Sequence, residues 1–245
     1  MKRKERTGVK NEIIKALEQN RNSYVSGGYI ARKCNVSRQA VFKAVKSLCD
    51  EGYKITGESG KGYKLDATCD ILSADVITEF TDLPAFCYES VGSTNFVAMG
   101  KYYDNRDCIV TADTQTAGER KDGGDFYSPE YGVYVSYAIT KQGYIKDIDE
   151  VRKAAAQAVL TCVKPFAPEA ELREIDEIYS NGKKIGGILI QTFSTAASGL
   201  YRFVVIGVGL YCNREDMPSG VKSVNLKETR NKLVIDIFRE LKKRI

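Results

Sequence analysis

The strongest constraint on the fold is the segment NVSRQAVFKAVKSLCDEGY, residues 35–53. Its apolar side chains recur at helical spacing, which predicts a helix with one buried face. Ser37 fits the N-cap, because its hydroxyl can accept a backbone N–H from the first turn. Gly52 fits the C-terminal stop. The residues of the predicted buried face are Val36, Ala40, Val41, Ala44, Val45 and Leu48.

Two shorter helices and a hairpin are expected around this helix. Apolar residues from Val9 to Leu17 predict a first helix, and residues 27–34 predict a second. Because the connection to the third helix is short, the three form a helix-turn-helix. The pieces YKITGE and GYKLD, joined at SGKG, predict a two-stranded wing. Residues 1–66 are therefore expected to form a winged helix, with a linker at 67–72 and a second domain at 73–245.

Charge is distributed unevenly along the chain. Residues 1–66 hold 15 Lys and Arg against 7 Asp and Glu, whereas the remaining 179 residues hold 22 against 25. A basic head on a mildly acidic body indicates a polyanionic partner, which for a winged helix is a double-stranded DNA operator. A protein-binding winged helix is the alternative. The expected DNA-binding residues are Ser37, Arg38, Gln39, Lys43, Lys46 and, at the tip of the wing, Lys61.

The roles within this surface follow from docking geometry. The first turn of a recognition helix meets base edges, so Arg38 and Gln39 are expected to read bases. Lys43 and Lys46 lie further along the helix and would meet phosphates, and Lys61 would reach the flanking backbone.

Composition excludes several kinds of chemistry. The chain has no histidine, so Ser-His-Asp and Cys-His nucleophilic sites and HExxH metal sites are excluded. Its seven cysteines are scattered and none forms a CxxC pair, which argues against a disulfide framework and a zinc site. The expected location is a reducing, cytoplasmic compartment. No apolar run approaches the roughly 18 residues that span a bilayer, and the basic N-terminus lacks the apolar region of a signal peptide.

The body predicts an α+β domain. Strand-like runs alternate with helical ones after a short helix at 73–81, which favours a mixed or antiparallel sheet with flanking helices. The strand-like runs are AFCYES, DCIVTAD, GVYVSYAI, KIGGILIQTF and YRFVVIGVGLY. The helical runs are VRKAAAQAVLTCV and KLVIDIFRELKKR.

The order of short motifs resembles one known family over nearly the whole chain. A winged helix is followed by STN (Ser93–Asn95), QTAG…FYSP, NGKKIGGILIQ and GVGLYCN. This order resembles the bifunctional biotin–protein ligase and biotin-operon repressor family of the BirA type. The resemblance implies a biotin/lipoate-ligase-like domain that adenylates biotin with ATP and transfers it to a lysine of a biotin carboxyl carrier protein. It also implies that the adenylate-loaded form dimerises and represses biotin-synthesis genes. The basic helix at the end predicts that the small C-terminal β-domain of many relatives is lacking.

The resemblance implies a set of site residues. Polar side chains near STN could bind the ureido head of biotin, although Ser-Thr pairs also cap helices and Asn95 could be a turn residue. Lys184 would bridge the biotin carboxylate and the nucleotide phosphate; the alternative is an exposed lysine at a strand start. Glycines 186, 187, 207 and 209 would let a ligand approach the backbone. The expected biotin-binding residues are Ser93, Thr94, Asn95, Gln115, Gly118, Glu119, Arg120, Lys121, Lys184 and Gly187, and the expected catalytic residues are Lys184 and Asp176.

The loop after Gln115 departs from the family pattern. Where the family has GRGRRGR, this chain has GERKDGG, so Glu119 and Asp122 stand at two of the arginine positions. Two unit charges about 4 Å apart interact by roughly 4 kcal/mol at an effective dielectric constant of about 20, so such changes weaken anion binding strongly. The family's KWPND segment becomes LREID, keeping only Asp176, and Tyr211 replaces the first asparagine of GxGxNxN.

Two functions are consistent with these observations. The first is a DNA-binding regulator whose ligase-like domain senses biotin, biotinyl-5′-AMP or a related effector, with ligase turnover weak or absent. The alternative is an active, divergent biotin–[acetyl-CoA-carboxylase] ligase and repressor, which would need ATP and Mg²⁺ and would reach the phosphates through Arg120 and Lys121. A protein-binding relic is a third possibility. A homodimer is expected from the resemblance, and no membrane partner is expected.

Overall fold

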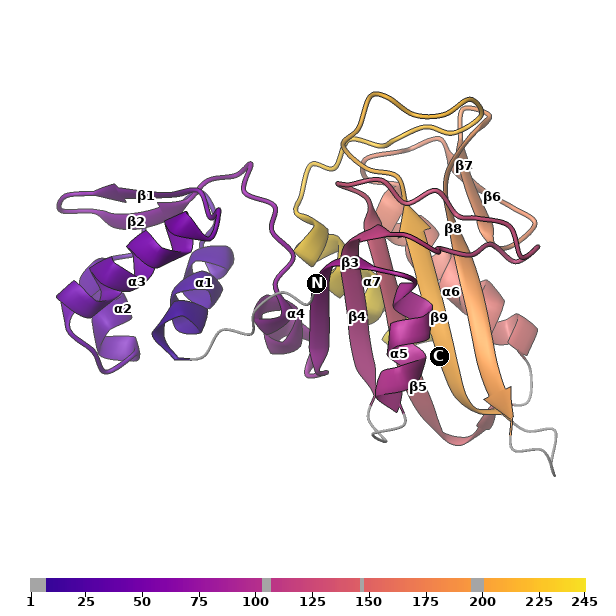
Figure 1. The fold of residues 1–245 in the computed structure, drawn as a ribbon, viewed down its shortest axis with the longest axis horizontal. Coiled ribbons are helices and arrows are strands. Elements are labelled where there is room, and N and C mark those ends of the chain that lie inside the picture. Colours follow the sequence, from indigo (N-terminus) through magenta and orange to yellow (C-terminus); the bar gives the residue numbers. More distant parts are fainter. Residues whose placement is uncertain (1–7, 103–106, 146–147, 195–200) are drawn as a thin grey trace.

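The computed structural model describes residues 8–102, 107–145, 148–194 and 201–245. A small N-terminal part of helices and a hairpin lies beside a larger body built on one sheet (Figure 1). The arrangement confirms the α+β fold with an N-terminal helix-turn-helix. None of the helices in these ranges is both long and apolar enough to cross a bilayer.

The N-terminal part has the predicted winged-helix order. Its elements are α1 (Val9–Gln19), α2 (Gly27–Lys33), α3 (Arg38–Asp50), β1 (Ile55–Glu58) and β2 (Gly62–Leu65). Ser37 caps α3 by accepting the Ala40 backbone N–H at 3.1 Å. Gly60 and Gly62 take positive φ angles of 80° and 114° in the antiparallel wing, as their turn required. Of the predicted buried face of α3, the residues at 41, 45 and 48 are fully buried and those at 36, 40 and 44 are half-buried.

The body is organised around a mixed seven-stranded sheet. Its order is β3 (Ala85–Val91), β4 (Cys108–Gln115), β5 (Val133–Ile145), β9 (Tyr201–Leu210), β8 (Lys183–Ser194), β7 (Glu177–Ser180) and β6 (Ala170–Arg173). The β3–β4 pair is parallel and every other neighbouring pair is antiparallel. The sheet is therefore of the mixed kind that the sequence predicted.

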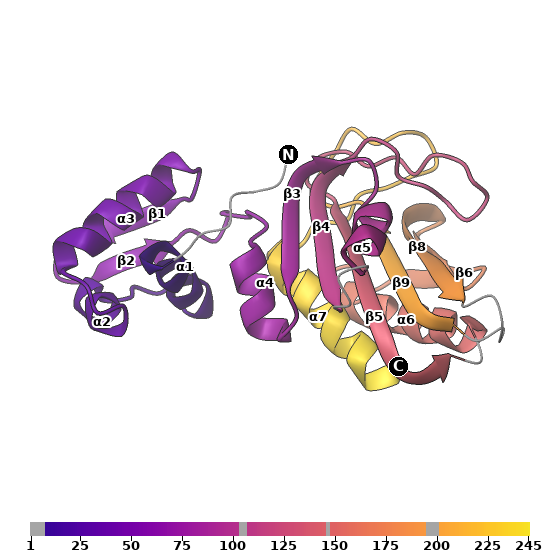
Figure 2. The ribbon, with the colours of Figure 1, turned by 60° about the horizontal axis from the view of Figure 1, so that its bottom comes forward.

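Helices cover both faces of this sheet. They are α4 (Ala74–Thr81), α5 (Thr94–Tyr102), α6 (Ile148–Val163) and α7 (Arg230–Arg244). Figure 2 shows α6 and α7 on one face and α5 on the other. Tyr137 and Phe238 join the sheet to α7 with ring centroids 6.1 Å apart, whereas Ala98 of α5 packs on Val110 and Phe203. The two faces thus have separate apolar cores, and the sheet is buried between them.

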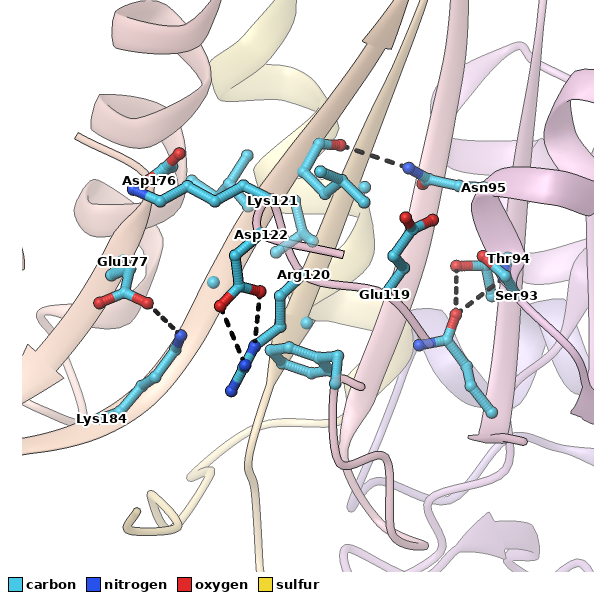
Figure 3. Close-up of a pocket in the computed structure, with 18 residues that line it drawn as sticks. Ser93, Thr94, Asn95, Glu119, Arg120, Lys121, Asp122, Asp176, Glu177 and Lys184 are labelled. Atoms are coloured by element: carbon cyan, nitrogen blue, oxygen red, sulfur yellow. Dashed lines mark hydrogen bonds and ion pairs between the residues drawn. The ribbon is translucent and has the colours of Figure 1, made fainter. Parts of the chain in front are cut away.

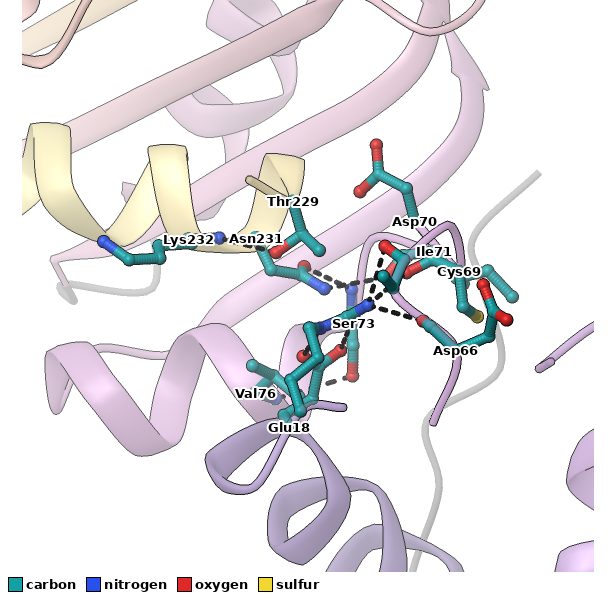
Figure 4. Close-up of polar contacts among 12 residues, drawn as sticks. Glu18, Asp66, Cys69, Asp70, Ile71, Ser73, Val76, Thr229, Asn231 and Lys232 are labelled. Atoms are coloured by element: carbon teal, nitrogen blue, oxygen red, sulfur yellow. Dashed lines mark hydrogen bonds and ion pairs between the residues drawn. The ribbon is translucent and has the colours of Figure 1, made fainter. Parts of the chain in front are cut away.

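The connection between the two parts is a packed segment rather than a free tether. Cys69 is 3% exposed and Leu72 is fully buried. Arg21, just after α1, donates to the backbone carbonyl oxygens of Asp66 and Cys69 at 3.0 and 2.9 Å (Figure 4). Because the segment is held by side chains from outside it, its path is well determined.

Helix α7 holds the same connection from the body. Asn231 accepts the backbone N–H of Ser73 at 2.9 Å and donates to the carbonyl of Ile71 at 2.8 Å (Figure 4). The guanidinium of Arg230, only 4% exposed, contacts the carboxylates of Asp70 at 3.0 Å and Asp113 at 2.9 Å. Charged groups this deeply buried are stable only when paired, so Arg230 fixes the connection, α7 and β4 relative to one another.

Candidate functional site

A pocket of about 150 Å³ opens where the start of α5, the end of β4, the first half of β8 and the end of β9 meet. The loop over residues 116–128 and the turn before β7 close its outer side (Figure 3). Four motifs singled out in the sequence, from STN to GVG, are therefore brought together by the fold. The lining residues are Ser93, Thr94, Asn95, Gln115, Glu119, Arg120, Lys121, Asp122, Phe126, Asp176, Glu177, Lys184, Gly187, Ile188, Leu189, Gly207, Val208 and Gly209.

The inner end of the pocket is a network of neutral polar side chains. The Gln115 carbonyl accepts hydrogen bonds from the Thr94 backbone N–H at 2.8 Å and the Thr94 hydroxyl at 3.0 Å. The Asn95 carbonyl accepts from Ser136 at 2.6 Å, and its amide donates to Gln191 at 3.0 Å. Thr94 and Asn95 are nearly fully buried, and such polar groups are stable only when hydrogen-bonded. The STN triplet is therefore part of the pocket wall and also the start of α5.

The glycines of β8 and β9 serve mainly to make room for side chains. A Cβ on Gly207 would lie 2.2 Å from the Asn95 side chain, and one on Gly209 would lie 2.4 Å from the Phe126 ring. A Cβ on Gly186 would meet the backbone of β9 at 2.4 Å. Protein atoms thus fill the Cβ positions of these three glycines, yet Gly207 and Gly209 still line the pocket, so a role toward ligand stays a prediction. Gly187 also lines the pocket and has ordinary clearance, because its Cβ would lie 3.6 Å or more from the nearest atoms.

The cations of the closing loop are already paired with carboxylates. Arg120 forms two hydrogen bonds to Asp122, both 3.0 Å long, and Asp122 also accepts the Gly124 backbone N–H at 3.1 Å. The hydrogen bond from Arg120 lowers the pKa of Asp122 below its ordinary value. Arg120 is thus folded onto its own loop and closes a tight turn.

Lys121 leaves the loop and reaches the turn before β7. Its ammonium lies 2.7 Å from Glu174 and 3.1 Å from Asp176, and these hydrogen bonds raise the pKa of Lys121. The family resemblance implied a catalytic role for Asp176. In the structure Asp176 is 8% exposed and forms an ion pair with Lys121. The ion pairs hold the loop against the turn.

Lys184 is also paired. Its ammonium forms a close ion pair with Glu177, the residue that begins β7 (Figure 3). Burial acts to raise the pKa of Glu177, but the hydrogen bond and charge of Lys184 outweigh it, so that pKa lies below its ordinary value. Lys184 is 15% exposed and lines the pocket. The alternative of an exposed strand-start lysine is therefore wrong, while a role toward ligand stays a prediction.

Glu119 differs from the other charged residues of the pocket. Its side chain extends from the loop into the pocket, on the side where Thr94 and Asn95 lie (Figure 3). Within the described ranges, no hydrogen bond or ion pair involves its carboxylate. Three cationic side chains and four carboxylates line the pocket, which gives it a formal charge of −1.

Aromatic side chains fill the outer end of the pocket. Phe126 stacks on Tyr211 with ring centroids 5.3 Å apart and an interplanar angle of 10°. Tyr211 is 4% exposed, and burial raises its pKa to about 12. The sequence identified Tyr211 only as a departure from the family's asparagine and did not predict its stacking partner. The FYSP motif, which contains Phe126, was the sequence signal that could have indicated this aromatic stack.

The presumed DNA-binding face of α3 is open to solvent. Arg38, Gln39, Lys43 and Lys46 are all exposed. The guanidinium of Arg38 lies over Gly28 of α2, where a Cβ would be 3.0 Å from Nη2.

Two further residues, Lys61 and Phe42, change the picture of this cationic surface. Lys61 is held on the wing by an ion pair of 2.6 Å with Glu58 and lies over the ring of Tyr24. Phe42, 59% exposed in the middle of the cationic face of α3, was missed because its position did not fit the buried stripe.

Comparison with known proteins supports the assignment of both the N-terminal helix-turn-helix part and the ligase-like body. A family model described as an HTH domain matches residues 9–64. "Bifunctional ligase/repressor BirA" of Bacillus subtilis (strain 168) is 28% identical over 230 residues, which cover 89% of this chain and 70% of that protein. The chain is thus similar to BirA-type ligase/repressors over most of its length. The BirA protein of Escherichia coli (strain K12) is 25% identical over 232 residues, covering 89% of this chain and 71% of its own length.

Solved structures agree on the fold of the body. The biotin protein ligase from Leishmania major in complex with biotin matches with a TM-score of 0.51 and 20% identity, over 63% of this chain and 71% of that one. The biotin protein ligase from Aquifex aeolicus in complex with biotin and ATP gives 0.53 and 16%, over 65% and 69%. The body therefore has the biotin-protein-ligase fold.

The fold brings together nearly all the site residues expected from this BirA-type resemblance. Nine of the ten biotin-binding candidates and Asp176 line one pocket. The exception is Gly118, which is buried and whose Cβ would lie 2.9 Å from Ser128, so it shapes the loop. Glu177 and Phe126 were missed: Phe126 lies in the FYSP motif, which was the signal for it, whereas nothing in the local sequence marks Glu177 as a pocket residue. In the described part of the chain, no group of three or more acidic or thiol side chains is arranged to hold a metal ion.

Proposed function

We propose that this protein is a DNA-binding transcriptional regulator whose ligase-like body binds a biotin-type small molecule as its effector, with little or no ligase turnover. The observation that carries the proposal is the combination of an exposed cationic α3 with a pocket whose cations are all paired with carboxylates. The protein would repress its genes as a homodimer on a two-fold operator.

The N-terminal part supports the DNA-binding half of the proposal. Exposed lysines along one helix provide the sequence-independent attraction to phosphates, and the first turn offers Arg38 and Gln39 to bases. A protein-binding winged helix does not need this cationic face. The HTH match over residues 9–64 and the BirA-type relatives support the same function.

The pocket supports an effector site better than a nucleotide site. Its neutral inner end offers hydrogen-bond donors and acceptors of the kind that orient a small polar ring system. A biotin-type ligand fits this chemistry, and relatives with this fold bind biotin. A phosphate would need cations, but Arg120, Lys121 and Lys184 are each held by a carboxylate. A nucleotide phosphate therefore meets no unpaired cation among the described lining residues, and this supports weak or absent adenylation.

The proposal is tested by measuring binding and turnover in the same preparation. Operator sequences are first selected from a random duplex pool, and the affinity for the selected DNA is measured with and without biotin. Biotin-dependent exchange of pyrophosphate into ATP is then assayed with Mg²⁺. We expect DNA binding that responds to biotin, and exchange near background. No sequence-specific binding at any biotin concentration would contradict the regulatory function.

An active bifunctional ligase is the alternative that the 28% identity to ligase/repressors favours. In that case Arg120 and Lys121 would leave their carboxylates to bind phosphates. Labelling of an acceptor carrier domain, with biotin, ATP and Mg²⁺, at a rate proportional to enzyme concentration would establish it and remove the claim of lost turnover.

A further inference from the structure

The exposed face of α3 carries an aromatic ring among its cations. We propose that this ring, the side chain of Phe42, contacts the 5-methyl group of a thymine in the major groove, within about two base pairs of the base that Arg38 contacts. The inference rests on the proposed DNA-binding function and assigns a further specificity-determining residue to the same surface.

Phe42 is exposed on a helix that buries its other large apolar side chains. Its exposed fraction is 59%, whereas Val41, Val45 and Leu48 are buried. Helix α3 packs against α1, α2 and β1 through that buried face, so the ring takes no part in the apolar core. Exposure alone does not identify a partner, because single apolar side chains are common on protein surfaces. The surroundings of the ring have to decide.

The ring lies among the side chains that are expected to contact DNA. Residues three and four positions apart are neighbours on a helix surface, so Arg38 and Gln39 adjoin Phe42 on one side. Lys46 adjoins it on the other side, and all these side chains are exposed. Long helical side chains lean toward the N-terminus of their helix, so the ring covers surface over the first turn. A helix that presents its first turn to base edges therefore brings the ring into the groove.

The cations around the ring are available to phosphates. Elsewhere in the winged helix, Lys33 lies 3.4 Å from Glu12, and Lys61 lies 2.6 Å from Glu58. No carboxylate among the described residues forms such an ion pair with a cation of α3. A ring surrounded by available positive charge is suited to the surface of a polyanion.

The same surroundings disfavour a protein partner for this face. Protein-binding sites present a contiguous apolar patch, with aromatic side chains at its centre and few charges beside them. The helix neighbours of Phe42 on the exposed face are polar or charged. In the described part of the winged helix, the other exposed large apolar side chain is Tyr29, which belongs to α2. An isolated ring offers too little apolar area for a protein, but enough for one methyl group.

The chemistry of the major groove selects the base. The 5-methyl of thymine is the apolar group that base edges present there, and the other groups are hydrogen-bond donors and acceptors. A phenyl ring beside a polar edge would displace water without replacing its hydrogen bonds. Phe42 follows Arg38 by four residues, about 6 Å along the helix axis, and base pairs are about 3.4 Å apart. The thymine therefore lies within about two base pairs of the base that Arg38 contacts.

Replacement of thymine by deoxyuridine tests the inference on the full chain, because it removes the methyl group and keeps the hydrogen-bonding groups of the base. The selected operator is synthesised with each thymine of one half-site replaced in turn, and affinity is measured by fluorescence anisotropy. We expect one thymine, close to the base pair that depends on Arg38, whose replacement weakens binding about fourfold. This is the effect of losing one buried methyl-sized contact.

A double-mutant cycle assigns this loss of affinity to the ring. In Phe42→Ala, binding to the thymine operator should weaken at least about fourfold, and deoxyuridine should cause no further loss. Phe42→Leu keeps an apolar side chain and should retain part of the difference between the two bases. Lys43→Ala is the matched control: it removes the adjacent exposed side chain, weakens binding to every duplex and should leave the difference unchanged. Thermal unfolding of each variant verifies that it is folded.

The outcomes separate this inference from the proposed function. An equal loss with deoxyuridine in Phe42→Ala and in the unaltered protein would overturn the thymine contact, as would an operator in which no thymine replacement matters. In both cases DNA binding would stand. Unchanged affinity of Phe42→Ala for every duplex would overturn the inference and leave the ring to a protein partner. Absence of any sequence-specific binding by the unaltered protein would reject the regulatory function and this inference with it.

Discussion

At the scale of single residues, function in this protein depends on what each charged or small side chain already contacts. Lys184 lies where a ligand-binding lysine is expected, yet its ammonium is already paired with the carboxylate of Glu177. Gly209 keeps the position expected of a ligand-facing glycine, yet the Phe126 ring fills the space above it. The residue type at one position thus predicts well where in the fold the residue lies, but it predicts poorly which side chains that residue contacts.

The close packing of Phe126 on Gly209 leads to a stability prediction. Gly209→Ala would place a Cβ 2.4 Å from the ring, so the Phe126–Tyr211 stack must shift. Overpacking of this kind costs about 1–3 kcal/mol, which a denaturant unfolding curve would measure. The matched control is Gly100→Ala in α5, where a Cβ meets nothing within 4 Å. Equal effects of the two substitutions would contradict the packing argument.

Arg38 provides the residue-scale prediction for DNA. If it reads a base from the first turn of α3, Arg38→Ala should weaken specific binding by about 1–3 kcal/mol and relax the preference at one base pair. Fluorescence anisotropy with the selected operator and single-base variants measures both effects. Lys153→Ala, an exposed lysine on α6, should leave them unchanged. An unaltered affinity in Arg38→Ala would exclude Arg38 from the recognition surface.

At the scale of elements, the loop between β4 and β5 and the connection before α4 are held by ion pairs that cross long stretches of sequence. Lys121 closes the loop onto the turn before β7. Arg230 ties the start of α7 to Asp70 and Asp113. Asp113 lies on β4 two residues before Gln115, so the connection to the winged helix and the inner end of the pocket share one strand.

The turn formed by Arg120 and Asp122 should depend on pH. The hydrogen bond from Arg120 lowers the pKa of Asp122, so the contribution of this carboxylate is complete above its ordinary value of about 3.9 and is lost as pH falls through the lowered value. The Gly124 backbone N–H donates to the same carboxylate, so its NMR chemical shift reports the titration. A midpoint at or above about 3.9 would contradict the ion pair.

The buried pairs of Arg230 should dominate the stability of the connection. Arg230→Met leaves the carboxylates of Asp70 and Asp113 without their shared partner, and breaking a buried ion pair costs about 3–5 kcal/mol. Thermal and denaturant unfolding measure this loss. Lys232→Met on the same helix removes ion pairs that are about half exposed, and is expected to cost about 1 kcal/mol or less. A loss in Arg230→Met no larger than in Lys232→Met would contradict the clamp.

At the scale of the whole molecule, a basic N-terminal part and a body with a weakly acidic pocket act on different partners. The N-terminal charge should appear as salt dependence of DNA binding. If Lys43, Lys46 and Lys61 each neutralise one phosphate, the slope of log affinity against log salt is about −3 per protomer. Lys61→Ala should reduce the slope by about one. A slope near zero in the unaltered protein would reject the phosphate-binding face.

Local sequence patterns determined the winged helix and the longer strands and helices of the body, but they missed β6, β7 and α5. Most of the pocket residues followed from the family resemblance. Helical spacing from Val36 to Leu48, the cap at Ser37 and the glycines of the wing specify structure within a few residues, so they can be predicted without the rest of the chain. The motif order similarly predicted that STN, Gln115 and Lys184 would meet.

Only the tertiary structure decided which charges the pocket offers to a ligand. Lys121 meets Glu174 and Asp176 more than fifty positions later, and Arg230 meets Asp70 and Asp113 across more than a hundred. Such contacts depend on which strands become neighbours in the sheet, and no local period encodes them. Because a paired cation and a free cation attract an anion very differently, the chemistry of the site follows from these distant pairings.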